Sequence, residues 1–129
     1  MQFSKFLAST LTSLVLVAGL MLPACAEPAI KKIPNHPRVN QVNQRRANQR
    51  ARIHQGVKSG QLTGSERHSL NTQESGIHSE EHTMRSEDNG HLTKADQRSL
   101  NQQQNQVSKD IFQDKHNSAT QPGVTPASP

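Results

Sequence analysis

The chain has 129 residues, a formal net charge of +5, 30% hydrophobic residues and no Trp or Tyr. This length allows one small domain, and the low apolar content excludes a large hydrophobic core. The near absence of aromatic side chains for base stacking, together with the export signal described next, argues against nucleic acid as a partner.

Residues 1–26 have the pattern of a secretory signal peptide. Lys5 precedes an apolar run from Leu7 to Leu22, and small residues follow up to Ala26. A membrane span is the competing interpretation, but the run is short for a bilayer and contains several Ser and Thr residues. We therefore predict an exported protein, periplasmic or secreted, that is cleaved after Ala26. Lipoprotein processing at Cys25 is the alternative, and cleavage after Ala26 leaves a mature chain without a thiol.

Proline-rich segments flank the predicted domain. Residues 27–38 contain three prolines and three basic residues, and residues 118–129 contain three prolines and no charged side chain. Both segments read as tails, the second as a disordered one. Residues 39–117 are poor in Pro and Gly and rich in polar straight-chain residues, a composition that favours helices and shows no alternation typical of strands.

The first predicted helix covers about residues 39–57. One face of this helix carries four apolar side chains, those of Val39, Val42, Ile53 and Val57. Arg46 and Arg50 fall on the same face. Either their aliphatic stems pack on the core while the guanidinium groups reach water, or the middle of this helix meets an anionic partner.

A repeat with a period of thirty residues follows this helix. Gly60-Gln61-Leu62-Thr63 is echoed by Gly90-His91-Leu92-Thr93, and the similarity continues to Ile77 and Val107. We expect two related helix-loop-helix units, at about 53–78 and 83–108.

The repeat also predicts where two helices begin. Thr63 and Thr93 each precede an acid by three residues, Glu66 and Asp96, which is the spacing of a capping box. We expect helices over about 64–84 and 94–115. Their apolar residues are spaced at about one per two turns, so each predicted seam is narrow. The two sets are Leu70, Ile77 and Met84, then Leu100, Val107, Ile111 and Phe112.

Charge changes sign along the chain. Residues 31–58 contain eight Lys or Arg and no acid, whereas residues 66–96 contain seven acids and three bases. Opposite charges attract, so the first helix can lie against the second with favourable sign. The sequence as a whole predicts an all-α fold with a basic N-terminal helix and two helix-loop-helix repeats.

The loops resemble those of degenerate EF-hands, if residues 55–66 and 85–96 are taken as the twelve-residue loops. Gly60 and Gly90 then occupy the sixth position, which makes the sharp turn, and Glu66 and Asp96 occupy the twelfth. The chelating positions depart from the pattern, because the first position is Gln55 in one loop and a cation in the other. The resemblance implies a helix-loop-helix turn without calcium binding.

Residues 39–117 also resemble small exported bacterial proteins of unknown function. Those proteins have an Asn-Gln-Arg-rich helix, two Gly-x-Leu-Thr units and a closing Ile-Phe/Tyr-x-x-Lys-His segment. Here these parts are Asn43-Gln44-Arg45, the two repeats, and the segment from Ile111 to His116. The resemblance implies a helical protein of the cell envelope and no particular activity.

One short motif has the spacing of a metal site. His78-Ser79-Glu80-Glu81-His82 matches an inverted zinc-protease motif and places two imidazoles one helical turn apart. A protease also needs a further ligand and a substrate cleft, which this small core does not favour. His78 and His82, with Glu81, could instead bind Zn, Cu or Ni, and the competing interpretation is a solvated helix face.

We therefore expect a non-enzymatic interaction or scaffold module of the cell envelope. The proposed contact residues are four arginines on the basic helix, Arg45, Arg46, Arg50 and Arg52. They suit an acidic protein or an anionic envelope surface. The alternative is a divalent-metal-binding protein that uses the His pair or the degenerate loops. The narrow seams also allow a chain that folds on a partner or as an oligomer.

Overall fold

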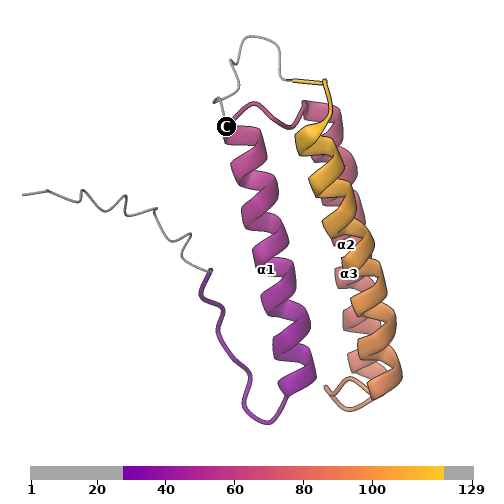
Figure 1. The fold of residues 1–129 in the computed structure, drawn as a ribbon. Helices are drawn as coiled ribbons and strands as arrows, with labels where there is room; N and C mark the ends of the chain where they lie inside the picture. Colours follow the sequence, from indigo (N-terminus) through magenta and orange to yellow (C-terminus); the bar gives the residue numbers. More distant parts are fainter. Residues whose placement is uncertain (1–27, 121–129) are drawn as a thin grey trace, which may run out of the picture.

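The computed structural model describes residues 28–120 and contains three α-helices. Helix α1 spans Pro37–Lys58, α2 spans Gly64–Glu87 and α3 spans Lys94–His116. Each helix runs opposite to the one before it, so the chain goes up, down and up again (Figure 1). Residues 28–120 include no strand, which confirms the all-helical prediction, and none of their helices is long and apolar enough to cross a membrane. The predicted signal peptide and residues 121–129 lie outside the described residues.

Capping boxes start the second and third helices. In α2 the Thr63 hydroxyl accepts a hydrogen bond from the Glu66 backbone N–H, and the Thr63 backbone N–H donates to the Glu66 carboxylate at 2.7 Å. Thr93 and Asp96 make the same reciprocal pair in α3. These bonds satisfy backbone donors that have no partner inside the helix. Both helices begin at the residue that the sequence predicts.

The two connections are short because each helix is stopped by a residue with positive φ. Gly60 has a φ of +74° and Gly90 a φ of +88°, values that favour glycine. In the first connection the Leu62 backbone N–H donates to the carbonyl of Gly56 at 3.0 Å. This bond turns the Leu62 side chain back into the bundle, where it is fully buried.

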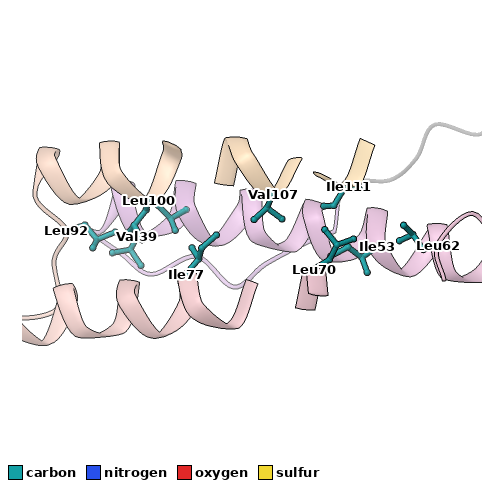
Figure 2. Close-up of a cluster of buried hydrophobic side chains, with 10 residues drawn as sticks. Val39, Ile53, Leu62, Leu70, Ile77, Leu92, Leu100, Val107 and Ile111 are labelled. Carbon is teal, nitrogen blue, oxygen red and sulfur yellow. The ribbon is translucent and has the colours of Figure 1, made fainter. Parts of the chain in front are cut away.

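The core is a single row of apolar side chains between the three helices (Figure 2). Ten apolar residues are buried there, namely Val39, Val42, Ile53, Leu62, Leu70, Ile77, Leu92, Leu100, Val107 and Ile111. Val57 and Met84 are only partly buried at its edge. Phe112, which the sequence grouped with the seam of α3, is 58% exposed and stacks on His116 instead. Ile111 already occupies the inward position of that turn, so its neighbour points outward.

Four polar side chains fill the turns between these apolar residues. Gln49, Glu74, Glu81 and Gln104 are each at most 3% exposed. The two glutamines tie α1 to α3, because Gln49 donates to the backbone carbonyl of Gln104 at 2.6 Å and Gln104 donates to that of Val42 at 3.0 Å. Helix α3 packs closely against both other helices, whereas α1 and α2 touch less extensively. Helix α1 does lie against α2, but it packs more extensively on α3, which the charge pattern does not predict.

A segment before α1 folds back along that helix (Figure 1). We call residues 28–36 the strap. Asn40 holds it with two hydrogen bonds to the backbone of Ile33, both at 2.8 Å, and Gln44 donates to the carbonyl of Pro28 at 2.9 Å. At its end His36 stacks on His91 of the second connection.

Two helical glycines give opposite predictions for replacement by Ala. A Cβ on Gly56 would lie 2.7 Å from Leu62 Cγ, whereas a Cβ on Gly76 would meet nothing within 4 Å. We expect Gly56→Ala to lower the free energy of unfolding by about 1–3 kcal/mol, because the core must move apart. Gly76→Ala should raise it by about 1 kcal/mol through helix propensity. Urea unfolding followed by circular dichroism measures both, and equal stabilisation by both changes would contradict the packing of Leu62 on Gly56.

Candidate functional site

The seam between α1 and α2 is hollowed in two places. The first hollow, of about 490 Å³, is called here the glutamate hollow, because the buried Glu74 forms part of its wall. The second, of about 370 Å³, is called the arginine hollow. Its charged and titratable lining consists of Lys31, Arg46, Arg50, His78, Glu81 and Arg85. Arg50 lines both hollows, so they form one groove along the bundle.

Arg46 and Arg50 lie one turn apart on α1 and face this groove. Arg46 is partly buried and Arg50 is exposed. Within residues 28–120 neither guanidinium makes a hydrogen bond or an ion pair within 4 Å. Burial lowers the pKa of Arg46, the charge of Arg50 lowers it further, and the carboxyls of Glu74 and Glu81 act in the opposite direction. The two arginines therefore repel each other. No carboxylate of residues 28–120 that lines the groove pairs with either of them directly.

Glu81 on α2 is buried and fully engaged. Its carboxylate oxygens lie 3.2 Å from Arg85 Nη1 and 3.4 Å from His78 Nδ1. Arg85 also donates from Nε to the carbonyl of Gly90. Glu81 thus fixes two side chains of its own helix, and neither ion pair within residues 28–120 joins α1 to α2.

Glu74 is the unusual residue of the groove. It is 1% exposed, and neither carboxylate oxygen has a hydrogen-bond partner within the described part of the chain. Burial raises the pKa of Glu74 to about 7, against the attraction of Arg46 and Arg50 for the charged form. A buried polar group without a partner costs about 1–3 kcal/mol, which the protonated form reduces.

The thirty-residue repeat supplies a comparison for Glu74. Gln104 holds the same position in the second unit. It is also buried, but its amide donates to the Val42 carbonyl of α1. The same seam position therefore forms an interhelical hydrogen bond where α3 meets α1, and leaves an unpartnered carboxyl where α2 meets α1.

The four arginines predicted as partner contacts do not form one patch. Arg46 and Arg50 face α2, whereas Arg45 and Arg52 reach across α1 to α3. Arg45 donates to the side-chain oxygens of Asn101 and Asn105, at 2.9 Å and 2.5 Å. Arg52 donates to the backbone carbonyl of Ser108 at 3.3 Å. These acceptors are neutral, so both arginines keep an unbalanced charge.

Two of the three predicted metal ligands lie on the surface of α2, and the third, Glu81, is buried. His78 and His82 are exposed, and His78 contacts the buried Glu81. The described residues contain no group of three His, Cys, Asp or Glu side chains arranged to hold a metal ion. Glu81 is also shared with Arg85, so a metal on His78 would compete with a cation for that carboxylate.

The loop residues matched to EF-hand positions have structural partners. Residues 55–58 belong to α1, and residues 85–87 belong to α2. Glu66 accepts from Thr63 and from Asn117, and Asp96 accepts from Thr93. Their carboxylates thus serve the helix starts in this structure.

Sequence reasoning missed Glu74, Lys31 and Arg85. Glu74 could have been found, because it lies between Leu70 and Ile77 at the spacing of a buried seam position. Lys31 could not, since nothing local predicts that the strap folds back on α1.

Comparisons of this chain with protein-family models, curated proteins and solved structures find no match.

Replacing Glu74 by Gln tests its buried state. A folded pKa of about 7 against 4.5 for the ordinary group means that the folded chain holds a proton that the unfolded chain has released. The free energy of unfolding should therefore fall as pH rises from about 4.5 to about 7, by up to about 3 kcal/mol. Glu74→Gln should remove this part of the pH dependence. Urea unfolding at several pH values measures it.

The control for this variant is Glu87→Gln, which changes an exposed acid near the end of the same helix. It should keep the wild-type decline between these pH values. If the free energy of unfolding of Glu74→Gln declines with pH as much as that of wild type, Glu74 is solvated.

Proposed function

We propose that this chain is a non-enzymatic, exported interaction module of the cell envelope that binds an anionic partner through α1. The supporting observation is the state of its arginines. Arg46 and Arg50 have no acid within ion-pair distance in residues 28–120, and Arg45 and Arg52 bond to neutral oxygens. Helix α1 therefore presents charge that its own fold leaves unbalanced, which attracts anions.

The finer architecture belongs to this proposal. A basic N-terminal helix is followed by two related helix-loop-helix units, whose turns derive from an EF-hand-like pattern without its calcium chemistry. The roles of Glu66 and Asp96 in capping boxes support this interpretation, because their carboxylates already accept hydrogen bonds. Export rests on the leader-like residues 1–26.

A divalent-metal-binding function is the second candidate. It is favoured by the position of His78 and His82, exposed one turn apart on α2, with Glu81 3.4 Å from His78. Two imidazoles at this spacing can chelate Zn, Cu or Ni. Coordination responds to chelator, whereas attraction to an anionic partner responds to salt.

The first function predicts binding to anionic vesicles or to polyglutamate that weakens with salt. A fourfold Arg→Gln variant at 45, 46, 50 and 52 should lose most of this binding, because it removes four of the six Lys and Arg side chains of α1. Co-sedimentation at low salt and at about 1 M NaCl, where charges are screened within about 3 Å, measures it.

The matched control removes the same charge elsewhere, from four cations of α3 that lie outside the groove: Lys94, Arg98, Lys109 and Lys115. It should retain most of the binding. An equal loss in both variants would mean that net charge, and not α1, attracts the partner.

The second function predicts that Zn²⁺ raises the melting temperature and that His78→Ala/His82→Ala abolishes the rise. The reason is that a ligand of the folded state alone stabilises it. The control is His54→Ala/His68→Ala, which also removes two exposed imidazoles. The same zinc response in all three proteins would remove this candidate.

A further inference from the structure

The arginine hollow combines side chains from three separate parts of the chain. Arg46 and Arg50 come from α1, His78 and Arg85 from α2, and Lys31 from the strap. Four cationic side chains therefore surround a space of about 370 Å³ whose lining, within residues 28–120, includes one carboxylate, that of Glu81. The hollow is positive even when His78 is neutral.

The single carboxylate does not neutralise the cations from α1. Glu81 is 1% exposed and is occupied by Arg85 and His78 of its own helix. Arg46 and Arg50 make no ion pair with it. Arg46 is also partly buried, so water screens its charge less than that of a surface residue. A second anion inside the hollow would relieve the repulsion between the two arginines.

The strap closes one side of this space. Ile30 and Lys31 line the hollow, and the strap is held on α1 by Asn40 and Gln44. Ala47, the residue of α1 between the two arginines, also lines it and has a small side chain that leaves room there. The hollow is therefore bounded by two helices and by the strap, unlike a patch of charges on an open helix face.

We propose that the arginine hollow binds a tetrahedral oxyanion of the phosphate type, either free or as the headgroup of a lipid. Arg46 and Arg50 contact its oxygens, Lys31 closes over it, and Glu81 acts as a positioning residue for Arg85 and His78. A guanidinium presents paired N–H donors that match two oxygens of a phosphate, which makes arginine the usual residue for this group. The proposal deepens the proposed function, on which it rests, by naming the anion and its site.

Thermal unfolding in phosphate and in chloride tests the site directly. The melting temperature of the purified protein, in the form isolated from cells, is measured at one pH and one ionic strength while phosphate replaces chloride. The melting temperature should rise with phosphate and saturate, because the ion binds the folded state. Amide resonances of Lys31, of residues 43–50 and of His78 should shift with the same midpoint. An unchanged melting temperature as phosphate replaces chloride would overturn the site. Resonance shifts spread evenly over the chain would do the same.

Two variants tie the effect to the hollow. Arg46→Gln/Arg50→Gln should weaken the apparent phosphate affinity at least about tenfold, because two charge-assisted contacts are lost. Lys31→Gln should weaken it less, and it changes an exposed strap residue outside the helices. The matched control, Arg98→Gln/Lys109→Gln, removes two exposed cations of α3 and should keep the affinity. Equal affinity in the control and in Arg46→Gln/Arg50→Gln would contradict the proposal.

Vesicles distinguish the two sources of the anion. If vesicles of phosphatidylglycerol bind the chain and free phosphate displaces them, the lipid headgroup uses the hollow. If free phosphate binds and such vesicles do not, the ligand is the free ion. If vesicles bind equally well to wild type and to Arg46→Gln/Arg50→Gln, and phosphate binds neither protein, the hollow is not an oxyanion site.

The last result would still leave the proposed function standing. Binding that depends on salt and is lost only in the fourfold arginine variant would place the partner on Arg45 and Arg52, outside the hollow. The proposed function would be contradicted by vesicle binding that does not weaken with salt, whether or not free phosphate binds the hollow.

Discussion

A shortage of apolar side chains governs this structure. Three helices of 22 to 24 residues supply eight buried apolar residues, and their connections add Leu62 and Leu92, so the helical turns between these residues must be filled by something else. Polar side chains fill them, and each needs a partner because an unpaired buried polar group is costly. Helices pack closely where these polar side chains have partners on the opposite helix. A groove remains where they do not.

Glutamine solves half of the problem between α1 and α3, because the side-chain oxygens of Gln49 and Gln104 have no hydrogen-bond partner in residues 28–120. The amides of Gln49 and Gln104 each donate to a backbone carbonyl of the opposite helix, so the polar turns become interhelical links. Glutamate and arginine do not solve it between α1 and α2. Glu81 pairs within its own helix, Glu74 pairs with nothing among the described residues, and Arg46 faces both across the seam. The proposed oxyanion site uses this second seam, because Arg46 and Arg50 there have no acid within ion-pair distance in residues 28–120.

Local signals predicted the helices well. The Thr-x-x-acid spacing at Thr63 and Thr93 gave the starts of α2 and α3, since a capping box needs only residues within one turn. The apolar spacing predicted most of the core for the same reason. It misplaced Phe112, because two adjacent apolar residues cannot both point inward from one helix, and the pattern does not say which one does.

Nonlocal contacts were harder to predict. The charge pattern allowed α1 to lie against α2, but it did not predict the more extensive packing of α1 on α3, which includes the hydrogen bonds of Gln49. The His78 and His82 motif was visible in the sequence, whereas the arginine hollow was not. Its members come from the strap, α1 and α2, and only the fold brings Lys31 next to Arg46.

The shortage of apolar residues leaves Glu74 buried between α1 and α2 without a partner in residues 28–120. Carbon-13 NMR of the Glu74 side-chain carboxyl, titrated over pH in the folded chain, tests this claim most directly. We expect a titration midpoint near pH 7, the value to which burial raises the pKa of this group. A midpoint near 4.5, the ordinary value for a solvated glutamate, would contradict it and would mean that water fills the seam between α1 and α2.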